Sequence, residues 1–220
     1  MEADVAARAA VHAALGDPVR LALVDDLVVS DRSPAELGER HGLSSNLLAH
    51  HLGVMERVGL IERYVSSGDR RRRYVRLVHE TLAGIGITAG MPDGRMVFVC
   101  SHNSARSQLA AALWRVEMGG EAESAGTHPA DRVHPGAVAA AHRAGLDLSG
   151  ARPRGIDEVD LGGAQVVTVC DRAHEELEPG RSWWHWSIPD PAEYPTDEAF
   201  DQALGRIRRR VVALKERTTR

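Results

Sequence analysis

Cys100 and Arg106 are the residues whose types and spacing first suggest chemistry. Five residues separate them in the segment VFVCSHNSARSQLA, where an apolar strand-like run ends and a helical pattern begins. A tight loop at a helix N-terminus turns successive backbone N–H groups inward and forms a nest for an anion. The guanidinium of Arg106 adds a forked donor that matches a tetrahedral oxyanion. The spacing therefore predicts a loop that binds a phosphate-like group.

The same loop predicts a nucleophile, because its positive field would stabilise the thiolate of Cys100. Ser107 is placed to hydrogen-bond to the sulfur, and Asn103 is placed to brace the loop. The alternative is a buried structural cysteine beside a helix that happens to begin with arginine. The preceding strand, the following helix and the two polar residues together favour the nucleophile. The predicted oxyanion loop also contains Ser101, His102, Ser104 and Ala105.

The elements around this loop predict an α/β domain with a parallel sheet at residues 95–220. Residues 95–100 and 164–169 read as buried strands, and residues 124–126 as the end of a shorter strand. Strands that alternate with helices favour parallel pairing. The expected helices cover residues 106–118, 133–144 and 198–215.

The first 85 residues show a different pattern, in which helices are followed by a hairpin. Asp17, Ser33 and Ser44 are N-cap signals, and each precedes a helical pattern. Two strand-like runs, 60–65 and 73–77, flank a Ser-Ser-Gly-Asp turn. This order predicts a winged helix-turn-helix at residues 1–85. The Gly-rich stretch at residues 86–94 is the predicted linker.

Composition limits the remaining possibilities. The net charge of -4 means that any DNA binding must come from a local basic patch. The two cysteines are too few for a disulfide scaffold, and no Cys/His pairs have the spacing of a metal site. The eleven histidines are scattered, and we expect them to be surface or helix-packing residues. With no secretory signal or membrane-length apolar run, we expect a cytoplasmic protein without a bound cofactor.

The segment CSHNSARS resembles the signature loop of the low-molecular-weight protein tyrosine phosphatases and of the arsenate reductases that share their fold. SAGTH at residues 124–128 and HPGAVAAAHRAGLDLS at residues 134–149 are similar to segments that follow in these families. WSIPDP at residues 186–191 resembles their general-acid loop. This resemblance implies that Asp190 protonates the leaving oxygen.

Three features look more like the arsenate reductase branch. His102 stands where the phosphatases usually have glycine, and no aromatic residue directly follows Asp190-Pro191, although Tyr194 is close. Cys170 resembles the resolving cysteine of the thioredoxin-coupled reductases; otherwise it is a small apolar residue at a strand end. The third cysteine of that branch is absent here, so either Cys170 pairs directly with Cys100 or an external low-molecular-weight thiol resolves the intermediate. The resemblance also implies an external thiol reductant, thioredoxin or a low-molecular-weight thiol or redoxin. The alternatives are a tyrosine phosphatase and a regulator that only senses the oxyanion.

The first half resembles ArsR-type winged-helix repressors in ALGDPVRLALVDDL at residues 14–27 and SSNLLAHHLGVMERVGLIERY at residues 44–64. The resemblance implies a homodimer that binds double-stranded DNA. The leading hypothesis is therefore a transcriptional regulator fused to an arsenate reductase in arsenic resistance. An exposed edge of the second helix of the pair would reach base edges and phosphates, and an arginine cluster in the hairpin would contact phosphates or the minor groove. The expected DNA-binding residues are Ser44, Ser45, Asn46, His50, Arg70, Arg71, Arg72 and Arg73.

Overall fold

The computed structural model describes residues 2–83, 94–180 and 182–215. The chain divides into two compact units, one of Met1–Ser66 with Arg70–Gly90 and one of Ser67–Asp69 with Met91–Arg220. Apart from Gly94, the predicted linker at residues 86–94 lies outside the described residues. No helix in the described part of the chain is long and apolar enough to cross a membrane.

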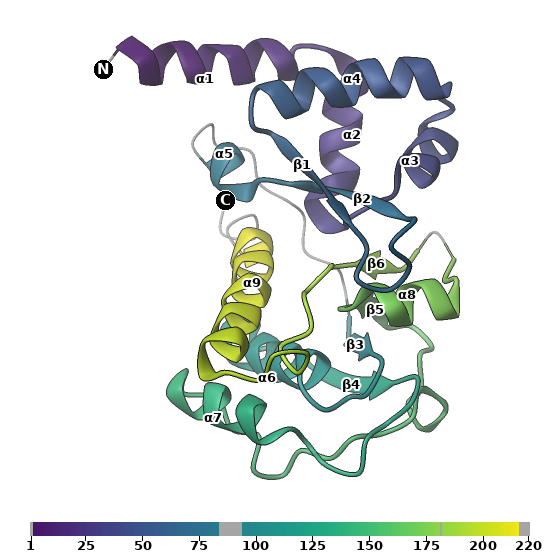
Figure 1. The fold of residues 1–220 in the computed structure, drawn as a ribbon, viewed down its shortest axis with the longest axis vertical. Helices are drawn as coiled ribbons and strands as arrows, with labels where there is room; N and C mark the ends of the chain where they lie inside the picture. Colours follow the sequence, from purple (N-terminus) through teal and green to yellow (C-terminus); the bar gives the residue numbers. More distant parts are fainter. Residues whose placement is uncertain (1, 84–93, 181, 216–220) are drawn as a thin grey trace. The chain divides into compact units, whose positions relative to one another are not determined.

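The first unit consists of helices and one antiparallel hairpin (Figure 1). Its hairpin pairs Ile61 with Leu77 and Val65 with Arg73, so the predicted strands at 60–65 and 73–77 are present within a residue. A further bridge joins Arg32 to Val75. The elements are α1 (Glu2–Leu15), α2 (Pro18–Val29), α3 (Pro34–His41), α4 (Ser45–Arg57), β1 (Ile61–Val65), β2 (Arg73–Leu77) and α5 (His79–Ala83).

The predicted caps determine where these helices begin. The Asp17 carboxylate accepts hydrogen bonds from two backbone N–H groups of α2, and Ser33 forms a capping box with Glu36 at the start of α3. The Ser44 hydroxyl accepts from the backbone of α4. Gly42 follows α3 in the left-handed region, at φ +63°, which glycine adopts without strain. The local sequence is thus sufficient to place α2, α3 and α4.

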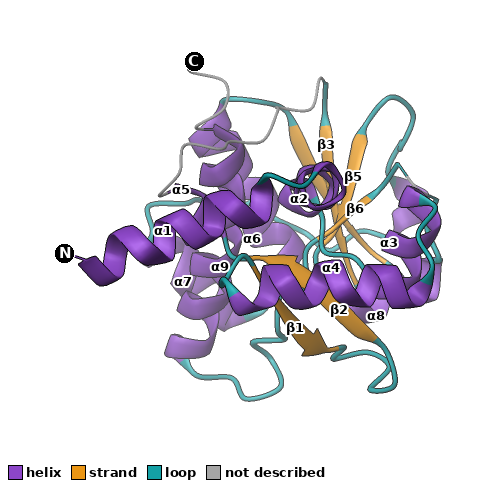
Figure 2. Ribbon diagram, turned by 90° about the horizontal axis from the view of Figure 1, so that it is seen from above, coloured by secondary structure: helices purple, strands orange, loops and turns teal. Residues whose placement is uncertain are grey.

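The second unit is built on a four-stranded sheet with the order β4-β3-β5-β6, and every pair in it is parallel. This confirms the predicted α/β domain with a parallel sheet. Figure 2 labels β3, β5 and β6 of this sheet. Its principal elements are β3 (Met96–Cys100), α6 (Arg106–Met118), β4 (Ala122–Gly126), α7 (Pro135–Arg143), β5 (Gln165–Thr168), α8 (Asp171–Leu177), β6 (Trp184–His185) and α9 (Asp197–Lys215).

The central strand β3 is buried along its whole length, because both faces of the sheet are covered. On one face, Phe98 contacts the indoles of Trp114 and Trp186, with ring centroids 5.9 and 5.6 Å apart. On the other face, Val97 and Val99 belong to an apolar cluster that also contacts Leu177 at the end of α8. Helix α6 packs against the sheet and against α9, which in turn contacts α7. This packing holds the carboxyl end of β3 rigidly.

Four short elements have no counterpart among the predictions. These are α5 with five residues, the 3-10 helix η1 (Ile156–Glu158) with three, α8 with seven and β6 with two. Elements of this length are shorter than the window over which hydrophobic periodicity can be recognised. Two of them, α8 and β6, nevertheless carry polar residues beside the site described next.

Candidate active site

Cys100 is the last residue of β3 and lies where the carboxyl ends of the parallel strands meet. Cys100 pairs with Gly126 of the neighbouring strand β4, and Cys100 is only 2% exposed. An added Cβ at Gly126 would come within 2.8 Å of both Asn103 N and Ser101 O, so the loop after Cys100 runs directly against the end of β4. Ligands of open parallel sheets bind at this edge.

The backbone of the loop is oriented by the segment that follows β4. Four loop carbonyls accept hydrogen bonds of 2.7–3.1 Å from backbone N–H groups of residues 127–134. Because these carbonyls face that segment, the loop's N–H groups are available on the opposite side, as an anion nest requires. The pairs are Thr127 N with Cys100 O, His128 N with Ser101 O, Ala130 N with His102 O and His134 N with Ser104 O.

Asn103 connects the loop to Cys100 through hydrogen bonds. Its φ of +48° is in the left-handed region, and its backbone N–H donates to Cys100 Sγ at 3.2 Å. Its Nδ2 donates to Ser107 Oγ at 2.8 Å, and that hydroxyl lies 3.0 Å from Cys100 Sγ. Since Ser107 Oγ accepts from Asn103, its own hydrogen is available for the sulfur. The sulfur therefore has two hydrogen-bond donors, the Asn103 backbone N–H and the Ser107 hydroxyl.

Arg106 begins α6 and is 6% exposed. Its Nη1 donates to Ile188 O at 3.2 Å, and its Nη2 contacts Asp190 Oδ2 at 2.6 Å. Burial by itself would lower the pKa of Arg106, but negative charge on Cys170, Cys100 and Asp190 raises it above the ordinary value. The guanidinium thus stays charged, and both of its terminal nitrogens donate to the segment at residues 188–190, which contains the proposed acid.

Asp190 stands in the turn after β6, with a side chain that is 35% exposed. Its Oδ1 accepts from the backbone N–H of Ala192 at 3.0 Å, which fixes the Asp-Pro-Ala turn. The fold therefore brings Asp190 into contact with Arg106, six residues after Cys100, although 84 positions separate Asp190 from Arg106 in the sequence. Of the remaining predicted loop residues, Ala105 and Ser101 are buried, Ser104 is half-buried and His102 is exposed.

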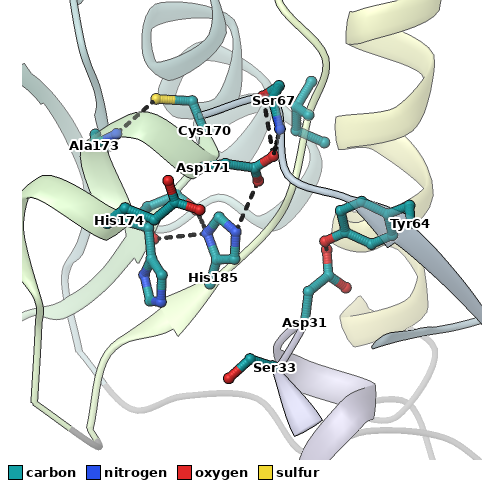
Figure 3. A network of polar contacts seen from close by, with 12 residues as sticks. Asp31, Ser33, Tyr64, Ser67, Cys170, Asp171, Ala173, His174 and His185 are labelled. Carbon is teal, nitrogen blue, oxygen red and sulfur yellow. Dashed lines mark hydrogen bonds and ion pairs between the residues drawn. The ribbon is translucent and has the colours of Figure 1, made fainter. Parts of the chain in front are cut away.

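Cys170 lies beside the same loop. It is 1% exposed, and its Sγ is 3.5 Å from the Oγ of Ser101, the residue after Cys100. Its Sγ also caps α8 by accepting from Ala173 N at 3.4 Å (Figure 3). Burial raises the pKa of the Cys170 thiol, while the charge of Arg106 opposes that change. Both cysteines are free thiols.

A buried polar cluster next to Cys170 was missed by sequence analysis. Asp171 and His185 are 1% and 0% exposed and form an ion pair, with His185 Nε2 donating to Asp171 Oδ1 at 3.1 Å (Figure 3). Thr168 Oγ1 lies 3.0 Å from His185 Nδ1 and 2.9 Å from His174 Nδ1. The two imidazole rings stack at 4.1 Å. The expectation that the histidines are surface or helix-packing residues is wrong for His185, which a two-residue strand carries into the core.

The pKa of Asp171 is lowered. Burial alone would raise it, but the hydrogen bond and charge of His185, together with a hydrogen bond from Ser187, outweigh burial. Asp171 is therefore ionised at neutral pH, and the cluster holds the first turn of α8 in place. No sequence signal marks this pair, because neither residue stands in a recognisable motif.

The expected DNA-binding residues all lie in the first unit or its hairpin. Ser44 caps α4, Ser45 and Asn46 form its first turn, and His50 is one turn further along; all four are exposed. The arginines at positions 70–73 are also exposed and lead into β2. Within residues 2–83, 94–180 and 182–215, no group of three or more His, Cys, Asp or Glu side chains is arranged to hold a metal ion.

Comparisons with known proteins agree with the geometry of the second unit. A family model described as low molecular weight phosphotyrosine protein phosphatase matches residues 95–220. Arsenate reductase 2 of Staphylococcus haemolyticus is 32% identical over 132 residues, which are 58% of this chain and 100% of that protein. An arsenate reductase of Halalkalibacterium halodurans is 35% identical over 118 residues, 50% of this chain and 84% of that protein.

A solved structure, a mutant of YwlE from Bacillus subtilis, matches with a TM-score of 0.50. It is 18% identical in sequence, and the match covers 58% of this chain and 100% of that one. At this identity the likeness shows a shared fold and nothing more.

Proposed function

We propose that this protein reduces arsenate. Through residues 95–220, the chain belongs to the low molecular weight phosphotyrosine protein phosphatase family, and it is an enzyme with a cysteine-based mechanism. The observation that carries this proposal is the second thiol. Cys170 Sγ lies 3.5 Å from Ser101 Oγ, beside the nucleophile's loop. Ester hydrolysis needs one nucleophile, whereas reduction of arsenic(V) needs two electrons, which a pair of thiols can supply.

In the first step, the loop N–H groups and Arg106 hold arsenate, and the Cys100 thiolate attacks arsenic. An S–As bond forms while one As–O bond breaks, and Asp190 protonates the departing oxygen so that it leaves as water. For this step, Arg106 Nη2 must exchange its 2.6 Å contact with Asp190 for the oxyanion. That exchange places the acid beside the leaving oxygen.

In the second step, the thiolate of Cys170 attacks Cys100 Sγ. The S–S bond forms as the S–As bond breaks, and the S–As electron pair stays on arsenic, which becomes arsenic(III). Arsenite leaves, and a Cys100–Cys170 disulfide remains. An external thiol reductant, thioredoxin or a low-molecular-weight thiol or redoxin, returns two electrons and restores both thiols.

The test is arsenate reduction by the purified full chain, with thioredoxin or a small-thiol relay offered as reductant. Cys100→Ser should abolish reduction altogether. Cys170→Ser should carry out the first covalent step yet fail in multiple turnover. Full multiple turnover of Cys170→Ser with the same reductant would remove Cys170 from the mechanism. Tight arsenate binding without turnover would instead favour a regulator that senses the oxyanion.

A second candidate function is hydrolysis of phosphotyrosine. The family description supports it, and so does Tyr194, which is 75% exposed four residues after Asp190 and could contact a substrate ring. The discriminating measurement is the rate on an aryl phosphate against the rate on arsenate. Fast aryl phosphate hydrolysis with no arsenate reduction would establish the phosphatase.

We propose further that residues 1–85 are an ArsR-type winged-helix domain that binds double-stranded DNA, joined by residues 86–94 to the enzyme domain at 95–220. The order of α2, α3, α4, β1 and β2 supports this assignment, as do the exposed polar residues at the start of α4. The first unit contains no cysteine, so any thiol-based sensing would use Cys100 and Cys170. The protein would then act in the cytoplasm as an arsenic-resistance regulator with its own reductase.

A homodimer through α1 is part of this proposal. Most side chains of α1 whose burial is described are exposed, and Val5 is 58% exposed. Such an apolar surface is suited to a symmetric contact with a second copy. Light scattering on the full chain would measure the oligomeric state, and Val5→Glu should shift a dimer to monomers. A monomeric wild-type chain would contradict this part of the proposal.

DNA binding is tested by fluorescence anisotropy with DNA from the region upstream of the protein's own coding sequence. Asn46→Ala and His50→Ala should each weaken specific binding by about ten-fold, the size expected from losing a base contact. His142→Ala, an exposed histidine of the second unit, is the matched control. Equal affinity for the upstream DNA and a scrambled duplex would contradict sequence-specific regulation.

A further inference from the structure

A cavity of about 500 Å³ lies in the second unit, between α6, β4 and the segment at residues 147–154. This volume is in the range of small-molecule sites. None of the residues 100–107 lines it, so the cavity is separate from the oxyanion loop. The side chains on which the following argument depends are Gln108, Arg115, Glu123, Ser124, Arg152 and Arg154.

One wall of the cavity carries an unpartnered polar group. Ser124 is 5% exposed and lines the cavity, and its hydroxyl makes no hydrogen bond within the described residues. A ligand seated in the cavity could donate to or accept from this hydroxyl.

The charges around the cavity favour an anion. Glu123 is already compensated, since it pairs with Arg95 and with Arg154 at 2.9 Å, and these partners lower its pKa despite burial. Arg115 uses one N–H on Ala122 O. In the described part of the chain, the Arg152 guanidinium has no hydrogen bond or ion pair.

Asp147 is the other acidic residue of the lining, and its Oδ1 accepts from the backbone of Ser149. The three arginines of the lining exceed its two acidic residues, Glu123 and Asp147, by one charge. Guanidinium groups bind carboxylates and phosphates through paired hydrogen bonds. The cavity therefore has the chemistry to recognise carboxylate or phosphate groups.

Gln108 joins this cavity to the nucleophile. Its Nε2 donates to Arg152 O at 2.9 Å and to Asn103 O and Oδ1 at 3.1 and 3.0 Å. Arg154 N also donates to Asn103 Oδ1, at 2.8 Å. Asn103 in turn donates its backbone N–H to Cys100 Sγ. Displacement of the segment at 152–154 would therefore change the hydrogen bonds that orient Asn103 toward the sulfur.

We propose that this cavity is an effector site for a small organic anion bearing carboxylate or phosphate groups, and that its occupancy changes the reactivity of Cys100 through Gln108 and Asn103. The binding part of the proposal does not depend on which reaction the enzyme catalyses. The readout can therefore be the thiol itself rather than arsenate reduction. A failure of the effector site is then distinguishable from a failure of the proposed function.

The binding experiment is calorimetric titration of the full chain with citrate, a tricarboxylate used as the probe. Arg152→Ala and Ser124→Ala should weaken binding, the former by about ten-fold, as expected for losing a charged hydrogen bond. Arg132→Ala, an exposed arginine outside the lining, should leave binding unchanged. The proposed site is overturned if citrate does not bind at millimolar concentration. It is also overturned if only Arg106→Ala weakens citrate binding, because citrate would then occupy the oxyanion loop.

The coupling experiment measures the rate at which iodoacetamide alkylates Cys100 in a Cys170→Ser background, where no other thiol remains. Saturating citrate should change this rate at least two-fold. Arg152→Ala should shift this change to about ten-fold higher citrate concentration. The change should shrink in Gln108→Leu, which removes the donor to Asn103. An alkylation rate that is the same with and without bound citrate overturns the effector role.

Discussion

Asn103 shows how much of the candidate site depends on single residues. It adopts a left-handed backbone conformation at φ +48°, and its side chain is completely buried. Asparagine tolerates this conformation better than most residues, and its amide provides both the donor to Ser107 and the acceptor for Arg154 N. One residue therefore shapes the loop, holds Ser107 beside Cys100 Sγ and connects the loop to Arg154.

Replacement of Asn103 separates the backbone requirement from the side-chain requirement. Asn103→Ala and Asn103→Gly lose the same side-chain hydrogen bonds. Only the alanine variant is further destabilised, by about 1 kcal/mol, because alanine is strained in the left-handed backbone conformation. We therefore expect the alanine variant to unfold at lower urea concentration than the glycine variant. All four tryptophans lie after residue 94, so tryptophan fluorescence reports on the unfolding of this unit. Equal midpoints would show that the positive φ carries no strain.

Asp190 is the second test at this scale. Asp190→Asn keeps the side-chain shape but cannot supply a proton, so kcat for arsenate reduction should fall by about 10²–10⁴. Arg106 would no longer pair with a carboxylate, so oxyanion binding should be retained or strengthened. Steady-state kinetics together with a phosphate-binding titration measure both effects. An unchanged kcat would show that another group protonates the leaving oxygen.

Two short elements, α8 and β6, determine the surroundings of the second thiol. Cys170 caps α8, Asp171 is the first residue of that helix, and His185 belongs to β6. The Asp171–His185 pair ties the start of the helix to the edge strand of the sheet. Because both partners are buried, removing one leaves the other without compensation.

Asp171→Asn should therefore lower the free energy of unfolding at pH 7 by about 3–5 kcal/mol. Since the folded-state pKa of Asp171 is lowered, its stabilisation is present above the unfolded carboxyl pKa and is lost as the pH falls below about 4. The stability gap between wild type and variant should thus narrow in acid. Urea unfolding at a series of pH values from neutral to acidic measures this difference in the free energy of unfolding. The control is Asp131→Asn, a substitution at an exposed residue. A gap that is independent of pH would contradict the ionised pair.

At the scale of the whole molecule, two compact units carry chemistry of different kinds. The net charge is -4, so long-range attraction does not bring the entire protein to DNA. The exposed arginines at positions 70–73 form a local cationic segment instead. DNA affinity, if it comes from this segment, must depend steeply on salt.

The salt dependence of DNA binding tests that segment directly. Each phosphate contact contributes about -0.9 to the slope of log affinity against log salt concentration. The double variant Arg70→Ala with Arg71→Ala should therefore reduce the slope by about two per protomer. The matched control is Arg132→Ala with Arg152→Ala, two exposed arginines of the second unit. Equal slopes for both double variants would place the phosphate contacts elsewhere.

The sequence by itself determined the features that depend on neighbouring residues. Capping residues located α2, α3 and α4, and the apolar runs located β3 and β5. The interval between Cys100 and Arg106 implied a strand-to-helix loop, because both residues belong to one continuous segment. These inferences work because a cap, a turn or a strand is specified within a few residues of chain.

Only the tertiary structure decided which distant residues meet. Cys170 reaches Ser101 across 69 positions, Gln108 reaches Arg152 across 44, and His185 reaches Asp171 across 14. These contacts follow from the strand order β4-β3-β5-β6, which brings the carboxyl ends of separate strands to one edge. No local pattern encodes that order, because it results from the packing of helices on both faces of the sheet.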